Sequence, residues 1–280
     1  MKYAAVMFDV VDSRRYLERY DVQNILMSSV EYLNGMFHYA IKKEVVSSAG
    51  DEFQGLFLDL PSAFLYIRKL QLLIYPIKVR CGIGYGEIKY DKDEWMSSAF
   101  DGEAYYLARE AINSIGRKKS NAICFHTMSK YDRYLNVFCQ SSMEIKSSQS
   151  QIARLIELIA DIISPIHPVS ERLDFYDSVL DNRIRVIRQE QWNKVSSRYR
   201  DEELLNINLG YVFEARNLME EHTAGKVDFS MEEFWVRGMS TIIAQAMNTT
   251  RQNIDRYVSL GKIKESRTMD KAIYEMLGER

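Results

Sequence analysis

Two short segments constrain this chain more than any other feature, because each sets a carboxylate against a stretch with the pattern of a buried strand. Residues 3–10 form an apolar run that contains Asp9, and residues 44–58 form two β-like runs with Asp51 in the tight turn between them. Acidic residues are depleted in strands, and an ionised carboxylate at the edge of a core is costly unless it is paired or bound to a cation. If the two segments lie side by side, Asp9 and Asp51 repel each other. A divalent cation such as Mg²⁺ relieves that repulsion and often shares its oxygen ligands with substrate phosphates, so the first hypothesis is a metal–nucleotide site.

Composition limits the alternatives. The chain has 280 residues, of which 46% are hydrophobic and 27% charged, and its net charge is −2, so it suits one large or two to three small domains and is not a polyanion binder as a whole. Its three cysteines form neither a disulfide framework nor a zinc motif, which is typical of a cytoplasmic protein. No apolar run approaches the ~18 residues of a membrane helix, and we expect no membrane association.

The first part of the chain alternates between strand and helix patterns. We expect strands at residues 3–10, 44–48, 52–58, 76–85 and 121–126, and helices at residues 21–43, 61–73 and 102–115. The order β-α-β-β-α-β is that of a ferredoxin-like unit. The prediction is an α+β domain over residues 1–140, followed by an all-α region.

The second part carries helical patterns and no strand pattern. Serines at 141, 142, 147, 148 and 150 suggest a boundary. Helices are expected at residues 152–163, 173–196 and 204–221, so residues 150–225 are predicted to be a helical coupling region.

The last part, residues 226–280, contains a segment at 240–257 that fits a helix-turn-helix. Ala244 is small enough for two helices to cross, Asn248 suits a left-handed turn, and Ile254 is expected to be buried. The second helix would then present four side chains to a DNA major groove: Arg251, Gln252, Asn253 and Arg256. The alternative is a plain helical hairpin used for dimerisation.

Four segments in order resemble the class III nucleotidyl cyclase and GGDEF group of catalytic domains. They are the strand with Asp9, the Ala-Gly-Asp-Glu-Phe turn at 49–53, the Val-Arg-Cys-Gly-Ile-Gly-Tyr-Gly-Glu strand at 79–87 and the segment at 101–109, which looks like the group's Ala-x-Arg helix and ends at Arg109. With the C-terminal segment, the whole chain is similar to the SatD family.

The resemblance implies a set of functional residues. Asp9, Asp51 and the backbone carbonyl of Val10 match metal ligands for Mg²⁺ or Mn²⁺, and Arg109 matches the arginine that steadies a transferring phosphoryl group. It also implies a nucleoside triphosphate or another nucleotide as ligand and a homodimer as the functional unit. From the residues alone, Asp9 could instead cap a helix, Asp51 could be a simple turn residue, and Arg109 could form a surface ion pair.

The chain departs from the group at three positions. Tyr105 stands where cyclases place an asparagine, Ser47 where they place the lysine that reads the base, and Ala49 replaces the first glycine of the turn. These departures favour a DNA-binding regulator whose cyclase-like domain is a sensor. The alternatives are an active nucleotidyl cyclase or related nucleotidyltransferase, and an adaptor with neither activity.

Overall fold

The structure is a computed structural model, and it describes residues 1–13, 16, 19–49, 51–88, 102–116, 121–167, 176, 207–223 and 235–279. Contacts divide the chain into two compact units. The first unit comprises Met1–Ser147 with Lys271–Arg280, and the second comprises Ser148–Asp270. The division into three domains at residues 140, 150 and 225 stays a prediction.

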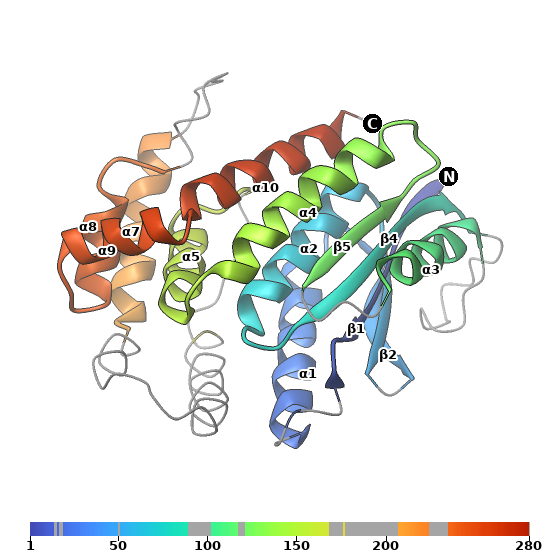
Figure 1. The fold of residues 1–280 in the computed structure, drawn as a ribbon, viewed down its shortest axis with the longest axis horizontal. Coiled ribbons are helices and arrows are strands. Elements are labelled where there is room, and N and C mark those ends of the chain that lie inside the picture. The colour runs from blue at the N-terminus through green and yellow to red at the C-terminus, as the bar shows by residue number, and fades with distance from the viewer. Residues whose placement is uncertain are drawn as a thin grey trace. The chain divides into compact units, whose positions relative to one another are not determined.

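The first unit is a mixed α+β structure built on one five-stranded sheet (Figure 1). Strand β1 (Lys2–Val10) lies at its centre, antiparallel to β3 (Glu52–Phe57) on one side and to β4 (Val79–Glu87) on the other. Strand β2 (Ile41–Ala49) pairs antiparallel with β3, and β5 (Ala122–His126) pairs parallel with β4. The opening strand therefore lies beside the 49–53 turn, as the sequence predicts.

Helices cover both faces of this sheet. Helix α3 (Glu103–Ile115) packs on β4, β1 and β5, while α2 (Leu60–Leu73) contacts β1, β3 and β4 from the other side and carries α1 (Arg19–Met36). Helix α4 (Asp132–Ser148) follows β5. In Figure 1, α3 lies on one side of the strands and α1 and α2 lie on the other.

Glycines in β4 allow α3 to approach the sheet closely. A Cβ atom on Gly82 would lie 2.1 Å from the carbonyl oxygen of Ala108, and one on Gly84 would lie 2.2 Å from that of Ala104. Helix backbone therefore occupies the space that side chains would need. The sequence pattern predicts this role, because the glycines alternate within a strand and do not form a phosphate-binding loop.

On each edge strand of the sheet, an asparagine side chain forms hydrogen bonds with the backbone of one residue. In β2, the amide of Asn34 donates to the carbonyl of Val45 (2.9 Å) and accepts from its N–H (3.2 Å). In β5, Asn136 binds the carbonyl (2.8 Å) and N–H (2.7 Å) of Phe125 in the same way. Each amide replaces part of a missing neighbouring strand, and unpaired edges are the places where sheets aggregate.

Several boundaries differ from the sequence prediction. Helix α1 ends at Met36 and not near residue 43, and β2 begins at Ile41. Phe37 and Ala40 are buried in the turn between them, so their apolar spacing continues the helical pattern past the true helix end. Strand β4 begins at Val79, three residues after the expected start at residue 76.

Helix α4 is a second correction. The sequence predicts a boundary at the serines of residues 141–150, and the division between the two units falls there, between Ser147 and Ser148. The serines at 141–148 nevertheless lie in the last two turns of α4, a helix that the sequence pattern does not indicate. Ser142 is fully buried, so a residue type common in linkers here serves helix packing. The chain breaks afterwards, where Ser150 caps α5 (Gln151–Ile163) by accepting from the N–H of Ala153.

The second unit is helical in its described residues. Helix α5 is buried along most of its length and contacts α7 (Leu209–Thr223), α8 (Met239–Ala246) and α9 (Arg251–Leu260). The chain ends with α10 (Ile263–Gly278), whose residues are shared between the two units. The helix expected at 173–196 lies outside the described residues except for Tyr176.

Buried ion pairs involve α5, one within the helix and one that joins it to α10. Arg154 contacts Glu157 at 2.9 Å with both side chains at least 98% buried, and Arg267 of α10 contacts Asp161 at 3.3 Å. Buried charges of this kind are tolerated when they are paired and hydrogen-bonded. Among the residues that the structure describes, no helix has the length and apolar character needed to cross a membrane.

Candidate functional site

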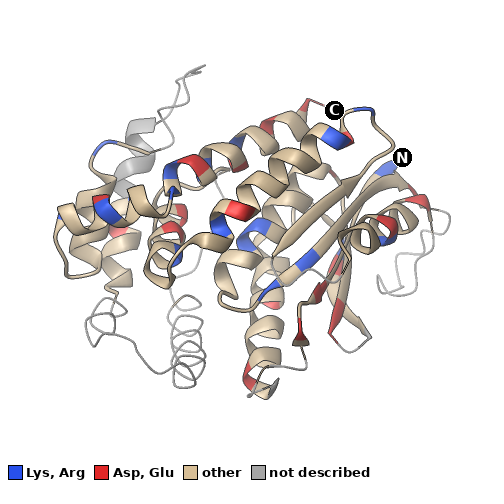
Figure 2. Ribbon diagram, viewed as in Figure 1, with Lys and Arg blue, Asp and Glu red and all other residues tan. Residues whose placement is uncertain are grey.

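Charged residues gather where β1, β3 and β4 come together at one end of the sheet. Asp9 lies opposite Glu52 on β3 and opposite Arg80 on β4. Because strand side chains alternate, Asp9 is on the same face as Met7, which pairs with Gly82 beneath α3. Figure 2 shows acidic and basic residues on these neighbouring strands. The site therefore lies on the face of the sheet that carries α3.

Arg80 binds Asp9 at two points. Its Nε donates to Oδ1 and its Nη2 donates to Oδ2, both at 2.7 Å, and its Nη1 donates to the carbonyl of Gly116 at 2.5 Å. The two side chains are 23% and 20% exposed, so the pair is largely shielded from water. A two-point contact of this geometry is the stronger kind of ion pair.

Asp51 also acts on Arg80. The hydrogen bond with Asp9 raises the pKa of Arg80 above its usual value, partial burial opposes that rise, and the charges of Asp9 and Asp51 add to it. The sequence predicts two carboxylates that converge on one cation. In the structure Asp9 binds a cation directly, the guanidinium of Arg80, and Asp51 acts on the same group through its charge.

Arg109 is held on the same side of the sheet by a different acid. Its Nη2 contacts Oε1 of Glu52 at 2.8 Å, with the two side chains 53% and 30% exposed. An exposed pair of this kind contributes little to stability, so Arg109 can change partners at small cost. Helix α3 sets its position by packing on the glycines of β4.

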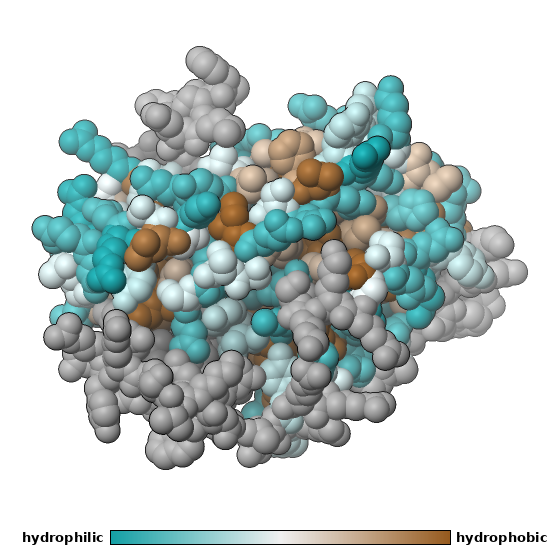
Figure 3. Space-filling view, in the orientation of Figure 1, coloured by the Kyte–Doolittle hydropathy of each residue, from teal (hydrophilic) through white to brown (hydrophobic). Residues whose placement is uncertain are grey.

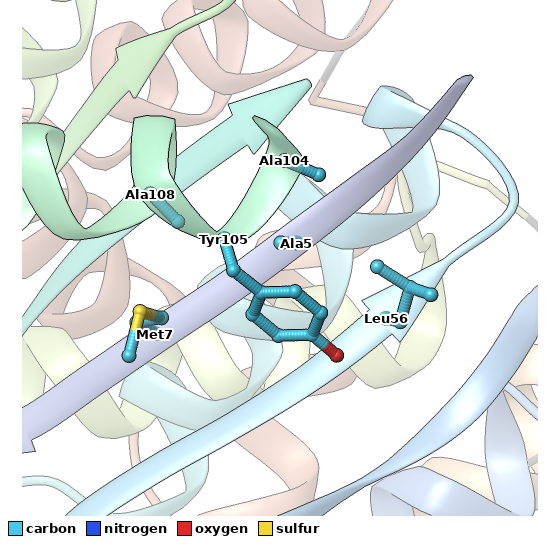
Figure 4. Packing of buried hydrophobic residues seen from close by; sticks show 6 residues of the cluster. All are labelled: Ala5, Met7, Leu56, Ala104, Tyr105 and Ala108. Atoms are coloured by element: carbon cyan, nitrogen blue, oxygen red, sulfur yellow. The ribbon is translucent and has the colours of Figure 1, made fainter. Parts of the chain in front are cut away.

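Tyr105 lies one turn before Arg109 on α3 and is buried, with 7% of its surface exposed. Its ring packs over Ala5, Met7 and Leu56, and its hydroxyl points toward β3 (Figure 4). Among the residues that the structure describes, none pairs with that hydroxyl, and burial raises the pKa of Tyr105 well above its usual range. The position that matches the cyclase asparagine is thus filled by an aromatic core residue.

The oxygen donors at this end of the sheet suit a hard cation in kind, but the carboxylate of Asp9 is already bound to Arg80. Asp9, Asp51 and the carbonyl of Val10 are oxygen donors, and Mg²⁺ commonly takes one or two carboxylates together with substrate phosphates. Within the described ranges, no group of three or more His, Cys, Asp or Glu residues could hold a metal by itself. A cation could therefore bind here together with a phosphate ligand, after Asp9 has left Arg80.

Arg80 and Glu52 are the functional residues that sequence reasoning missed. Both lie within the segments that carry the resemblance, and neither is assigned a role by it. The sequence does contain a signal for Arg80. It lies two residues before Gly82 in the alternating pattern of Gly82, Gly84 and Gly86, so it belongs to the same face of the strand. Pairing partners across strands cannot be identified without the register.

A second group of predicted residues lies on α9. Helices α8 and α9 are in contact, and Asn248 in the turn between them has a φ of 48°, as its residue type predicts. Ala244 and Ile254 are buried at 4% and 0% exposure. Thr250 caps α9 by accepting from the N–H of Asn253 at 3.2 Å.

The four predicted DNA contacts are not equivalent. Arg251, Gln252 and Arg256 are exposed, whereas Asn253 is half-buried and donates to the hydroxyl of Thr249 at 3.1 Å. Arg251 also pairs with Asp255 at 3.3 Å on the same exposed side. The positive charge of α9 is therefore partly neutralised.

Comparison with known proteins places the chain in one family. The model of the SatD family matches residues 3–199, which is more than half of the chain, so this protein belongs to the SatD family. No curated protein matches it. The match extends from β1 through α5 and covers the charged end of the sheet, but it stops before α9.

Proposed function

We propose that this protein is a DNA-binding regulator whose N-terminal unit is a cyclase-like sensor for a nucleotide and a divalent cation. The observation that carries the proposal is the two-point pair of Asp9 with Arg80 at the α3 face of the sheet, where the charge of Asp51 also acts on Arg80. A guanidinium fork and two carboxylates in one place suit a phosphate ligand and its cation.

The fold supports this proposal. The strand order β2-β3-β1-β4, with antiparallel neighbours throughout, is the arrangement expected of a ferredoxin-like βαββαβ unit, and β5 extends it through a parallel β4-α3-β5 connection. Cyclase and GGDEF domains are built on such a unit. Fold alone does not assign a function, so the argument rests on the charged residues.

Ligand binding would exchange the partners of Asp9. In the structure, Arg80 neutralises Asp9, so the site is satisfied without a ligand. With a nucleotide present, Asp9, Asp51 and the Val10 carbonyl would hold Mg²⁺ or Mn²⁺, and Arg80 would turn its fork to phosphate oxygens. Arg109 is able to do the same, because its pair with Glu52 is exposed. The bound cation would neutralise charge on the phosphates.

Tyr105 favours sensing over catalysis. An asparagine amide at this position could contact a ligand with a donor and an acceptor, whereas Tyr105 directs its ring into the cluster of Ala5, Met7 and Leu56. The alternative, an active nucleotidyl cyclase or nucleotidyltransferase, retains support from Arg109, which lies beside the charged residues and could stabilise a phosphoryl group.

One experiment separates these functions. The purified chain is incubated with each of ATP, GTP, CTP and UTP in the presence of Mg²⁺ or Mn²⁺, and binding is measured by calorimetry while products are sought by mass spectrometry. Binding of a nucleotide without turnover supports a sensor, and a cyclic or transferred product supports the enzyme. Asp9→Ala should abolish the cation-dependent binding while circular dichroism stays unchanged. Equal affinity in that variant refutes the site.

DNA binding is supported by the exposed side of α9. Arg251, Gln252 and Arg256 follow the turn at Asn248 and are accessible from solvent, as a recognition helix requires. The double variant Arg251→Ala/Arg256→Ala should weaken binding to double-stranded DNA and flatten its salt dependence by about two counterions. Lys271→Ala, at a half-exposed lysine of α10, is the matched control. A salt slope equal to that of the unaltered protein would argue against contact through α9.

A further inference from the structure

The outer side of α4 carries a stripe of exposed apolar side chains. Tyr131, just before the helix, is 51% exposed, and Tyr134, Val137 and Phe138 are 61%, 59% and 43% exposed. Residues three, four and seven positions apart share one side of a helix, so the four form a continuous surface. Figure 3 shows apolar side chains among hydrophilic ones on the face that carries α4.

This stripe is not needed to hold α4 in place. The opposite side of the helix supplies the core contacts, because Leu135 and Cys139 are fully buried and Met143 is 4% exposed. Asn136 fixes the helix to the edge of β5 through two hydrogen bonds. Large apolar side chains that remain outside such a core mark an interaction surface when they are contiguous.

The charges beside the stripe complement those of a second, antiparallel copy of the same helix. Arg133 and Glu144 are both exposed and lie eleven positions apart, which is close to three helical turns, so they occupy the same flank of the stripe about 16 Å apart. If a second α4 lies antiparallel against the first, Arg133 of each copy faces Glu144 of the other. The two-fold axis then passes beside Phe138, midway between them.

We infer that this stripe is an interface with a second copy of the chain, formed by two antiparallel α4 helices around a two-fold axis. A two-fold contact uses one patch twice and therefore needs a patch that complements itself. Asn34 and Asn136 already bond the backbone of one residue on each edge strand, Val45 and Phe125, which hinders strand addition as another route to a dimer. The surface is independent of the nucleotide and DNA proposals.

Sedimentation velocity of the full-length chain tests this interface over a concentration series into the tens of micromolar. We expect a monomer–dimer equilibrium that Phe138→Glu abolishes, because the change buries two charges at the axis. Tyr106→Glu, at a 58% exposed aromatic on α3, should leave the equilibrium unchanged. Circular dichroism checks that each variant is folded.

A charge exchange gives the second arm of the test and uses exposed side chains that leave the fold intact. Arg133→Glu should weaken the dimer roughly tenfold, since two exposed ion pairs become like-charge contacts. Arg133→Glu combined with Glu144→Arg should restore it. A monomeric unaltered protein, a dimer that neither change affects, or binding of the monomer through this stripe to anionic vesicles would each overturn the inference.

Discussion

Asp9 and Arg80 lie directly opposite each other on β1 and β4 and join through two hydrogen bonds of 2.7 Å. The pair neutralises a carboxylate at the edge of the core. From the sequence, we expected a divalent cation to neutralise it. Because the positive charge of Arg80 is held against both carboxylate oxygens of Asp9, it repels a second cation, so the pair competes with metal binding.

Replacing Arg80 should make the cation site easier to fill. In Arg80→Met, Asp9 loses its two-point partner and Asp51 loses a neighbouring positive charge. The affinity for Mn²⁺ without nucleotide should therefore rise roughly tenfold, about what a charged two-point contact is worth. Electron paramagnetic resonance of free Mn²⁺ measures this. Arg109→Met is the control, because it leaves the Asp9–Arg80 pair intact. A Mn²⁺ affinity equal in all three proteins would exclude competition.

Adding a methyl group at Gly84 should displace α3. The new Cβ atom would lie 2.2 Å from the carbonyl oxygen of Ala104 and 2.3 Å from the N–H nitrogen of Ala108, and backbone atoms cannot move aside cheaply. We expect Gly84→Ala to lower the free energy of unfolding by about 3 kcal/mol in chemical denaturation.

Gly35 provides the matched glycine. It lies in α1, where a methyl group added to it would have no atom within 4 Å, so Gly35→Ala should be neutral or stabilise the protein by about 0.5 kcal/mol. Equal losses in the two variants would mean that close packing of α3 on β4 is not the reason for Gly84.

Two buried tyrosines should respond differently to loss of the hydroxyl. The hydroxyl of Tyr66 can donate to the carbonyl of Val30 at 3.3 Å or to Oδ1 of Asn34 at 3.0 Å. Tyr66→Phe should therefore lower the free energy of unfolding by about 1 kcal/mol. The hydroxyl of Tyr105 has no partner within the described part of the chain, so Tyr105→Phe should leave stability unchanged or slightly higher. A loss at Tyr105 similar to that at Tyr66 would contradict an unpaired hydroxyl.

The same variant predicts a change at alkaline pH. Burial raises the pKa of Tyr105 above the usual value of 10.0, so above pH 10 the unfolded chain loses a proton that the folded chain keeps. The contribution of Tyr105 to the free energy of unfolding is therefore fully present below pH 10 and falls as the pH rises beyond it. Tyr105→Phe should make this fall less steep in thermal unfolding followed between pH 9 and 11, and an identical profile would contradict the burial effect.

Asn136 should protect the edge of β5. Asn136→Ala leaves the N–H and carbonyl of Phe125 without their side-chain partners, so we expect a loss of about 2 kcal/mol and faster aggregation on heating, measured by light scattering. Gln140→Ala, on the same helix and exposed, should have neither effect. Similar aggregation of both variants would show that the amide does not protect the edge.

Much of the first unit could be predicted from local pattern. Strand and helix periodicity indicated β1 to β5 in the right order, and the alternating glycines of β4 indicated close packing, because both signals lie within a few consecutive residues. Helix α4 was missed, since serines at 141–148 are typical of linkers, and only the buried surroundings of Ser142 explain why they are helical. The end of α1 was misplaced because a buried turn keeps helical spacing.

The sequence by itself determined that acidic groups would meet where the opening strand passes the 49–53 turn, because strand patterns and a tight turn are local properties. It also determined the family and the residue type suited to the turn before α9. The partner of Asp9 was decided by tertiary structure alone, since Arg80 reaches it only through the register of two strands about seventy residues apart. Ion pairing depends on that register, and no local pattern of residues encodes it.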